Sequence, residues 1–390
     1  MSAECVLIYV QHLLGIGHLM RAATLARAFA AAGFETNLVS GGMPVAPLPL
    51  ATEQLIQLPP VRAKNGNFSL LADEAGNLVD EAYRTTRRER LLSILRAKRP
   101  NVLIFETFPF GRRQMRFELL PLLEAALAMK PRPLIAASVR DILQTPKPGR
   151  AEEAVALAMR GFDLVLVHGD PALVTFEASF PLAAGLGEKL RYTGYIAGPP
   201  VARGKPGDAG WNEVIVSAGG GAVGGVLLAT AFASRPSTRL RDATWRFLVG
   251  RGAEDAELER LAAMQDNGVV VERARPDFRQ LLANCRVSIS QAGYNTVIDV
   301  MSAGARSVLA PFSKDGETEQ TMRATRLAQH HLAAVVLERT LSPRSLAAAV
   351  DHADAMKPDF GWINRRGAEA SVRIVREALR TRHSHPAAGV

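Results

Sequence analysis

The sequence contains few cysteines, and this scarcity excludes two classes of protein. Cys5 and Cys285 are the two cysteines among 390 residues. Two are too few for a disulfide-rich scaffold or for a metal site built from cysteine ligands. A chain this poor in cysteine suits a reducing compartment. No basic segment precedes the first apolar run, so we expect no signal peptide and a cytoplasmic protein.

Long apolar runs are also missing. A helix that crosses a bilayer needs about 20 consecutive apolar residues, and even the stretch at residues 119–129 is interrupted by Glu124. Apolar residues nevertheless make up 48% of the chain and charged residues 22%. These proportions are ordinary for a folded protein and exclude general disorder. At about 150 residues per domain, the length predicts two or three domains.

Positive charge is what the sequence has in excess. Lys and Arg number 47 against 38 Asp and Glu, which gives a formal net charge of +9. Such an excess is compatible with nucleic acid, an anionic membrane surface or acidic small molecules as partners. Seven of the cations lie in residues 84–99, which predict a basic helix with Leu91, Leu92, Ile94 and Leu95 turned inward. Arg112, Arg113 and Arg116 follow nearby.

Two interpretations of this basic helix remain open. A solvated face is the simplest, and docking on an anionic membrane surface is the alternative. No nucleic-acid recognition motif accompanies the charge, so we expect no nucleic-acid partner.

Apolar runs alternate with helical periods along the first half of the chain. The runs are mainly apolar rather than strictly alternating, which is typical of parallel strands covered on both faces. They are residues 6–10, 34–39, 101–105, 134–137 and 163–167.

A stretch rich in Gly and Pro, residues 197–210, interrupts this pattern, and the same alternation restarts after it. The second set of runs is residues 213–217, 245–249, 268–272, 287–290, 307–310 and 333–337. We therefore predict an α/β protein of two doubly wound, Rossmann-like domains facing a cleft. The expected domains are residues 1–198 and 199–361, followed by a basic helix and tail at 362–390.

Each predicted domain begins with a strand, a glycine turn and a helix. In the first, Gly15 and Gly17 precede His18 and Arg21. Backbone N–H groups at such a turn can approach a ligand closely. The dinucleotide fingerprint GxGxxG is incomplete because Met20 occupies its third glycine position, which disfavours a nicotinamide or flavin enzyme. His18 is a candidate general base, since imidazole titrates near neutral pH. The alternative is that it only caps the turn.

The second domain opens with a longer glycine turn at residues 217–225, which contains Gly219, Gly220 and Gly221. Such a turn exposes backbone amides to phosphate oxygens. No Gly-Lys-Ser/Thr follows, so this is not a P-loop. A tight turn without a ligand is the alternative.

The most specific pattern begins where the strand at 287–290 ends. Residues 290–299 read SQAGYNTVID, so a turn presents Gly293 and Thr296 at a helix start and Asp299 lies one helical turn later. A helix N-terminus for phosphate with a carboxylate for ribose hydroxyls forms a coherent nucleotide-diphosphate site. Further along, Glu319 and Gln320 offer polar groups suited to sugar hydroxyls.

The series SQAGYNT…D…AG…PF…E-x-EQ…RA resembles the donor-nucleotide signature of the MurG-like GT-B glycosyltransferases of the family 28 type. The GIGH loop, the SAGGGA loop and the final helix are similar to the same family, so the resemblance covers nearly the whole chain. It implies that the C-terminal domain holds a UDP-sugar, usually UDP-N-acetylglucosamine. It also implies that the final helix packs back on the N-terminal domain.

The resemblance also implies roles for single residues. Gly293 and Thr296 would lie near the diphosphate, and Asp299, where the family usually has Glu, on the ribose. Backbone around Arg275 would meet the base, Glu319 and Gln320 would meet the sugar, and His18 matches the family's base or cleft residue. The donor-binding candidates are Gly219, Gly220, Gly221, Arg275, Ser290, Ala292, Gly293, Thr296, Asp299, Glu319 and Gln320.

An Asp-x-Asp pair does not occur in the chain. Sugar transferases that hold Mg or Mn depend on such a pair to bind the diphosphate. We therefore expect metal-independent transfer with no cofactor, in which loop amides, helix dipoles and basic side chains stabilise the leaving UDP.

Polar residues at the ends of the N-terminal strands complete the candidate site. Ligands of open α/β sheets bind beyond the carboxyl ends of the strands, so Glu106 should lie near His18 and either orient it or replace it as base. Arg140 is suited to an anionic acceptor. The cleft candidates are Gly15, Gly17, Arg21, Arg140, Asp141 and His168, and for each a purely structural role is the alternative.

Three functions follow, from different classes. The leading hypothesis is an inverting glycosyltransferase that moves a sugar from a UDP-sugar to an acceptor hydroxyl, the acceptor being lipid-linked, a glycan or a small molecule. The second is a UDP-sugar hydrolase or epimerase of the same fold, since GIGHLMR is also similar to the GxGHxxR loop of the nucleotide-sugar hydrolase of pseudaminic acid synthesis. The third is a non-catalytic nucleotide-sugar binding protein.

Overall fold

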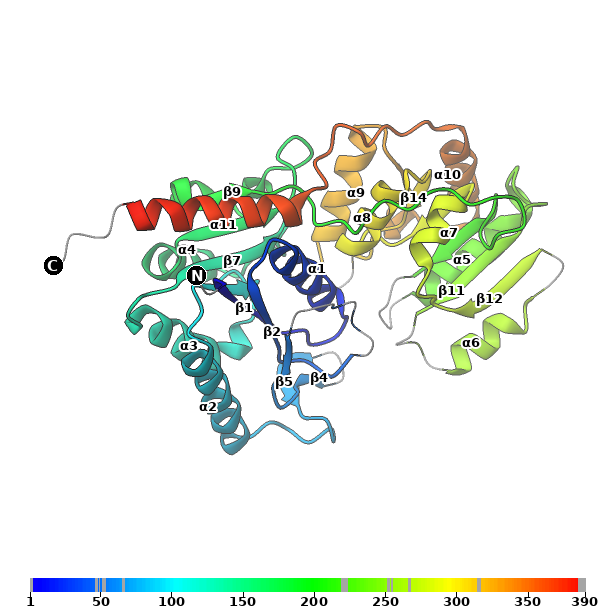
Figure 1. Ribbon diagram of the computed structural model, residues 1–390. Coiled ribbons are helices and arrows are strands. Elements are labelled where there is room, and N and C mark those ends of the chain that lie inside the picture. Colours follow the sequence, from blue (N-terminus) through cyan, green and yellow to red (C-terminus); the bar gives the residue numbers. More distant parts are fainter. Residues whose placement is uncertain are drawn as a thin grey trace. The chain divides into compact units, whose positions relative to one another are not determined.

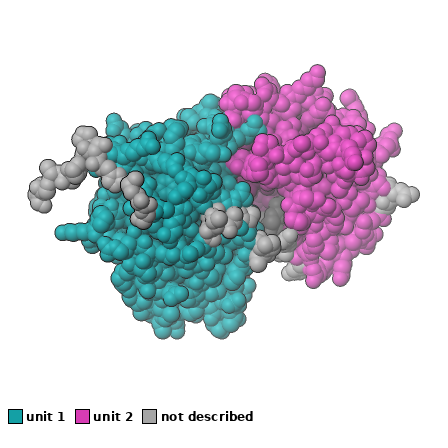
Figure 2. Space-filling model, in the orientation of Figure 1, with its two compact units in different colours: residues 1–196, 364–390 teal, residues 197–363 magenta. Residues whose placement is uncertain are grey.

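Two compact units make up the chain, in a computed structural model that describes residues 3–45, 48, 50, 54–64, 67–218, 224–250, 253, 255–265, 268–313 and 317–384. Unit 1 comprises residues 1–196 and 364–390, and unit 2 comprises residues 197–363. Figure 2 shows unit 1 in teal and unit 2 in magenta. The last segment of the chain therefore returns to unit 1, within two residues of the boundaries set out from the sequence.

Unit 1 is built on a parallel sheet of seven strands in the order β3-β2-β1-β6-β7-β8-β9. The order reverses between β1 and β6, which makes the carboxyl ends of these two strands the topological switch point. The strands are β1 (Cys5–Val10), β2 (Glu35–Ser40), β3 (Gln54–Gln57), β6 (Val102–Glu106), β7 (Leu134–Arg140), β8 (Leu164–His168) and β9 (Leu190–Tyr192).

Helices cover both faces of this sheet (Figure 1), which explains why its central strands β1, β6, β7 and β8 are mainly apolar. On β1, Leu7 and Tyr9 belong to one core and Val6 and Ile8 to the other. The first core takes in α2 (Glu81–Lys98), α3 (Arg116–Ala128) and α4 (Arg150–Gly161). The second takes in α1 (Gly17–Ala31) and α11 (Gly367–Ser384).

Local sequence signals explain where these helices begin and end. Asp80 caps α2 by accepting a hydrogen bond from the Tyr83 N–H at 2.8 Å, so the helix begins three residues before the basic segment. Gly33 follows α1 with φ of 90°, the left-handed conformation expected of a C′ glycine. Sequence patterns did not indicate the antiparallel hairpin of β4 (Arg62–Lys64) and β5 (Asn67–Ala72), which lies between β3 and α2.

Unit 2 repeats the architecture with a parallel sheet of six strands in the order β12-β11-β10-β13-β14-β15. Its order reverses between β10 and β13. The strands are β10 (Val214–Ser217), β11 (Trp245–Val249), β12 (Val269–Arg273), β13 (Val287–Ser290), β14 (Ser307–Leu309) and β15 (Ala334–Val335). The helices are α5 (Gly225–Ser234), α6 (Asp255–Ala262), α7 (Phe278–Asn284), α8 (Tyr294–Ala303), α9 (Glu319–Gln329) and α10 (Pro343–Ala355).

Two expectations about element ends require correction. The strand expected at residues 333–337 is limited to two residues, Ala334 and Val335. The last helix begins at Gly367 rather than at Trp362, because Asn364 first makes turn contacts: its N–H donates to Asp170 at 2.7 Å and its carbonyl accepts from the Tyr195 N–H at 2.8 Å.

The basic helix α2 does not present all its cations to solvent. Arg87 is fully buried and forms a two-pronged ion pair with Glu118 of α3, with both nitrogen–oxygen distances at 2.7 Å. Glu118 also accepts from the Tyr9 hydroxyl at 2.5 Å. Arg87 is therefore not part of the predicted cationic face. Its burial is possible because the Glu118 carboxylate compensates its charge. Leu92, expected inward, is only partly buried.

Candidate functional site

The switch point of unit 1 brings together two residues that lie 88 positions apart, His18 and Glu106. His18 lies in the first turn of α1, and Glu106 is the last residue of β6. Nδ1 of His18 lies 3.1 Å from Oε1 of Glu106. The carboxyl group is buried, whereas the imidazole keeps 19% of its side-chain surface exposed. The sequence prediction that Glu106 lies beside His18 is confirmed.

The proton arrangement of this pair follows from its surroundings. Arg21 donates to the same Oε1 of Glu106 and is itself buried. Burial alone would raise the pKa of Glu106, but Arg21, His18 and the Ser138 hydroxyl outweigh it and hold the pKa well below its usual range. Glu106 is therefore a carboxylate, which can only accept hydrogen bonds. Nδ1 of His18 also lies 3.2 Å from Nη2 of Arg21 and 3.3 Å from the Thr107 hydroxyl. Its nearest neighbour is the carboxylate, toward which an unprotonated Nδ1 would turn a lone pair, so we assign the ring proton to Nδ1, which donates to Glu106.

The opposite ring nitrogen of His18 is consequently a base. Burial, the positive charge of Arg112 and that of Arg21 lower the pKa of His18 well below its ordinary value, against the opposing effect of Glu106. The ring is therefore neutral at pH 7, with the lone pair on Nε2. Nε2 has no hydrogen-bond partner among the residues that the structure describes.

The other cleft candidates of unit 1 fall into two groups. Arg21 and His168 contact the buried polar cluster around Glu106, whereas Asp141 is completely buried and accepts from the Tyr195 hydroxyl at 3.1 Å and from the Ile142 N–H at 2.8 Å. Asp141 therefore stabilises the loop after β7, which corrects its expected position facing a ligand. Arg140 is partly buried at the end of β7. A Cβ on Gly15 would meet no atom within 4 Å, so the turn before α1 is open.

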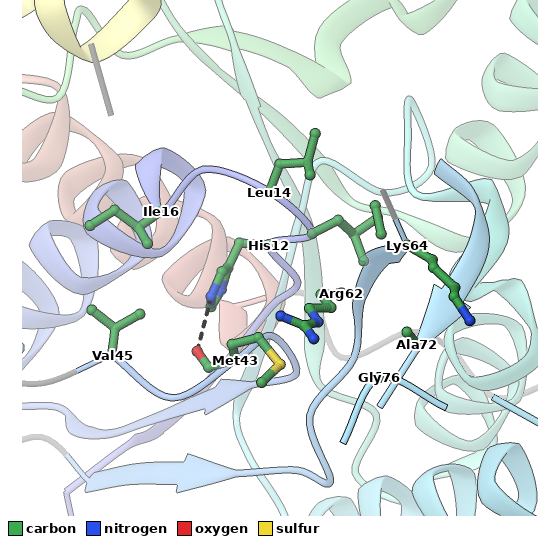
Figure 3. A pocket seen from close by; sticks show the side chains of 11 residues that line it. His12, Leu14, Ile16, Met43, Val45, Arg62, Lys64, Ala72 and Gly76 are labelled. Carbon is green, nitrogen blue, oxygen red and sulfur yellow. Dashed lines mark hydrogen bonds between the residues drawn. The ribbon is translucent and has the colours of Figure 1, made fainter. Parts of the chain in front are cut away.

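A pocket of about 450 Å³ opens beside this turn (Figure 3). Its apolar lining includes Leu14 and Ile16, which are 55% and 43% exposed. Two cations, Arg62 and Lys64 of β4, also line it, and neither has an ion-pair partner within the described part of the chain. Figure 3 shows His12 in the same pocket, with Nε2 hydrogen-bonded to the carbonyl of Met43 at 3.0 Å. The pocket therefore combines apolar walls with two uncompensated positive charges.

The switch point of unit 2 has a different character. Gly293 precedes α8 in an extended conformation and places no side chain on the helix N-terminus, and a Cβ there would meet no atom within 4 Å. The N-terminal amides of α8 are thus open to an anion. Ser290 Oγ is buried without a hydrogen-bond partner in the described part of the chain. Ala292 is buried and Thr296 partly buried.

Asp299 lies in α8 and has an unusual environment for a carboxylate. Burial raises its pKa to about 6, and the guanidinium of Arg279 on α7, whose Nε lies 3.3 Å from Oδ1, offsets this only in part. The side chain is 26% exposed. A further hydrogen-bond donor would strongly stabilise the ionised form of this carboxylate, and a sugar hydroxyl is such a donor.

Comparison with known proteins identifies the fold of the chain and the family of its C-terminal domain. Residues 220–374 match the model of the glycosyltransferase family 28 C-terminal domain. The chain has the GT-B fold and carries a family 28 C-terminal domain. The resemblance inferred from the SQAGYNT series is thereby confirmed.

A protein of Methylibium petroleiphilum is similar to part of this chain. It is a UDP-N-acetylglucosamine–N-acetylmuramyl-(pentapeptide) pyrophosphoryl-undecaprenol N-acetylglucosamine transferase, 37% identical over 82 residues. That segment is 21% of this chain and 22% of the relative, so the match spans about a fifth of either protein.

Two solved structures are similar to this GT-B chain over its full length. The calicheamicin glycosyltransferase CalG4 has a TM-score of 0.60 at 15% identity and covers 100% of both chains. MurG of Acinetobacter baumannii has a TM-score of 0.58 at 14% identity, covering 96% of this chain and 99% of the other. At these identities the likeness shows the fold.

Within the family 28 domain, two residues predicted to contact the sugar have different surroundings. Glu319 is buried, and its carboxylate pairs with Arg323 at 2.8 Å, so it is not presented to a ligand here. Gln320 is partly buried; its Oε1 accepts from the Ala292 and Phe312 amides at 3.1 and 3.2 Å, tying the ends of β13 and β14 together. Its Nε2 has no partner among the described residues, and contact of that nitrogen with the sugar stays a prediction.

The structure says less about the remaining residues that were predicted to bind the nucleotide-sugar donor. Arg275 pairs with Asp277 at 2.7 Å, which fixes the loop after β12 whose backbone is expected to meet the base. Gly219, Gly220 and Gly221 lie outside the described residues. No group of three or more potential metal ligands occurs in the part of the chain that the structure describes, and metal independence stays a prediction.

Sequence patterns missed two residues of the site. Arg279 was not singled out, although it faces Asp299, and Arg112 was assigned to surface charge although it acts on His18. No sequence signal indicated that α7 would place Arg279 against α8.

Proposed function

We propose that this chain is an inverting, metal-independent glycosyltransferase that uses a UDP-sugar donor, such as UDP-N-acetylglucosamine. The single observation that carries the proposal is the His18–Glu106 pair, in which a buried carboxylate fixes Nδ1–H and leaves a neutral, partly exposed imidazole with a basic Nε2. The family 28 domain with its uncapped α8 N-terminus supports donor binding in unit 2.

The proposed reaction is one displacement. Nε2 of His18 takes the proton of an acceptor hydroxyl, whose oxygen forms a bond to the anomeric carbon of the sugar. The bond from that carbon to the UDP oxygen breaks, and UDP leaves with the electron pair, so the anomeric configuration inverts. Glu106 stabilises the imidazolium that forms, and the amides at α8 stabilise the diphosphate.

His18→Ala tests the proposal. We expect turnover to fall by about 10²–10⁴, whereas the rise in melting temperature that UDP causes stays the same because the donor binds in unit 2. His352→Ala, which removes an exposed histidine of α10, is the matched control and should retain full turnover. Full turnover in His18→Ala would remove His18 as the base, and a retained configuration in the product would exclude a single displacement.

Transfer to water is the second candidate, since the same basic Nε2 can activate a water molecule. Incubation of the protein with UDP-N-acetylglucosamine alone separates the two. Rapid release of free sugar that added acceptors do not change would identify a hydrolase. A UDP shift in melting temperature without turnover of any donor would identify a binding protein.

The pocket of Figure 3 supports an acceptor that combines an apolar part with an anionic group. Leu14 and Ile16 would contact the apolar part, and Arg62 and Lys64 the anion. Farnesyl diphosphate should therefore raise the melting temperature more than farnesol does. The double variant Arg62→Gln/Lys64→Gln should abolish the difference between these two probes, and an unchanged difference would contradict this assignment.

Cytoplasmic location with peripheral contact at an anionic membrane belongs to the same proposal. No helix in the described part of the chain is long and apolar enough to span a bilayer. Arg90 and Arg96 of α2 are exposed, and each would add about 1 kcal/mol to binding at an anionic surface. Arg90→Glu/Arg96→Glu should therefore reduce sedimentation with phosphatidylserine vesicles at least tenfold, and equal sedimentation would exclude this surface.

A further inference from the structure

The buried polar cluster behind Glu106 extends beyond the residues used in the proposed reaction. Ser138 Oγ of β7 lies 2.5 Å from Oε2 of Glu106 and 2.9 Å from Nε2 of His168. Nδ1 of His168, at the end of β8, lies 2.9 Å from Oγ1 of Thr193. All four side chains are at most 1% exposed. Three adjacent strand ends thus supply a continuous chain of hydrogen bonds that reaches His18.

The direction of these bonds is set by the chemistry of their groups. Glu106 is a carboxylate and can only accept, so the single Ser138 proton points to Oε2. Ser138 must then accept from His168, which places the His168 proton on Nε2. Burial, together with the charge of Arg21, lowers the pKa of His168 to about 3, so the ring is neutral. The lone pair on its Nδ1 faces the Thr193 hydroxyl, which also lies 2.8 Å from the Gly194 carbonyl and 3.2 Å from the Val167 carbonyl.

This directed chain has a consequence for Glu106. Its Oε1 faces His18, Arg21 and the Thr107 hydroxyl, whereas its Oε2 accepts from Ser138. Rotation of the carboxyl group would break the Ser138 bond. A fixed carboxyl group keeps Oε1 directed at Nδ1 of His18, which keeps the proton on Nδ1 and the lone pair on Nε2.

We propose that Ser138 and His168 are positioning residues of the active site, which act through Glu106 to orient His18 and set its basicity. The inference rests on the proposed function in that His18 is taken as the base. Neither residue contacts the reacting atoms. The Ser138 hydroxyl directs the positive end of its dipole at Glu106, so it reduces the negative potential that His18 experiences.

Ser138→Ala should therefore raise the pKa of His18, because the imidazolium then faces a less compensated carboxylate. The Hε1 resonance of His18, assigned by its loss in His18→Ala, reports this pKa directly by NMR titration. We expect an upward shift of about one pH unit, and an upward shift of the acid limb of the rate profile by the same amount. UDP release from UDP-N-acetylglucosamine should fall about tenfold in kcat, with little change in KM.

Three further variants separate positioning from folding. His168→Gln keeps a donor toward Ser138 and an acceptor toward Thr193, and should behave as the unaltered protein. His168→Leu removes both and should resemble Ser138→Ala. Ser40→Ala is the matched control, because Ser40 is a buried serine at the end of β2 whose hydroxyl has no partner among the described residues. It should leave the His18 pKa and kcat unchanged.

The readouts distinguish failure of this inference from failure of the proposed function. An identical His18 pKa in Ser138→Ala and Ser40→Ala would overturn the positioning role, whatever the turnover. If His18→Ala retained full turnover while Ser138→Ala shifted the His18 pKa, the coupling would stand and the assignment of the base would fail. The NMR titration needs no substrate, so each result is obtained independently.

Discussion

The two switch points of this protein each contain a carboxylate near an arginine, yet their pKa values shift in opposite directions. Glu106 in unit 1 is more deeply buried, but contacts with Arg21, His18 and Ser138 hold its pKa well below the usual range. Asp299 in unit 2 has Arg279 at 3.3 Å, and its pKa rises to about 6. The number of donors, rather than the depth of burial, decides the sign.

This difference matches the different tasks we propose for the two units. Unit 1 satisfies its carboxylate internally, which fixes the geometry of His18 for chemistry. Unit 2 leaves donors and acceptors open: the α8 N-terminus has no side-chain cap, Ser290 Oγ has no partner among the described residues, and Asp299 lacks a full complement of donors. A site whose donors and acceptors lack protein partners is stabilised most by the hydrogen bonds of a polar ligand.

The largest expected effect is that of neutralising Glu106. Glu106→Gln should destabilise the protein by about 3–5 kcal/mol, because it leaves the buried guanidinium of Arg21 without its counter-charge. The free energy of unfolding from urea titration at pH 8 measures this. Stability equal to that of the unaltered protein would mean that Arg21 finds another partner for its charge.

Asp299→Asn should change stability in the opposite direction. The pKa of Asp299 is higher in the folded protein, at about 6, than the 3.8 of an unperturbed Asp. The folded state therefore binds more protons between these values, and stability falls as pH rises through this window. Removing the charge should raise the free energy of unfolding at pH 8 by about 1–3 kcal/mol, and a loss would show that the carboxylate is satisfied.

Donor affinity supplies the next test of the contrast. If Asp299 accepts from ribose hydroxyls, Asp299→Asn should weaken UDP binding about 10-fold at pH 8, because a hydrogen bond to a charged group is lost. Isothermal titration calorimetry with UDP measures this. Glu106→Gln is the control in the other unit and should leave UDP affinity unchanged, whereas equal losses in both variants would contradict the division of tasks.

The smallest expected effect is that kcat and the donor KM of the unaltered protein depend on pH in different ranges. His18 stays neutral to well below pH 6.5 because its pKa is lowered, so kcat should be constant from pH 8 to 6.5 and fall only at lower pH. The pKa of Asp299 is about 6, so about half of this carboxylate is protonated near pH 6, which should raise the donor KM as the pH falls through that value. Initial rates at saturating and limiting donor separate the two, and a kcat that falls with a midpoint at 6.5 or above would contradict the assignment for His18.

Much of the fold follows from patterns that are local in sequence. The strand at residues 245–249 is where it was expected, and that at 6–10 is one residue longer, since a short apolar run bounded by Gly, Pro or polar residues is typical of a covered parallel strand. The strand-end rule placed Glu106 beside His18. The hairpin of β4 and β5 was missed because its residues have no continuous apolar pattern, although four of them line the pocket of unit 1.

By itself the sequence determined which strands form, where the glycine turns enter helices, and that both halves repeat one architecture, because these depend on residues near each other in the chain. Only the tertiary structure decided how charged groups pair. Arg87 looked like a surface cation and is buried against Glu118, Glu319 looked like a sugar ligand and is held by Arg323, and Asp141 supports a loop. The energy of a charge depends on the groups around it in space, and a helical period does not specify which neighbouring element brings the opposite charge.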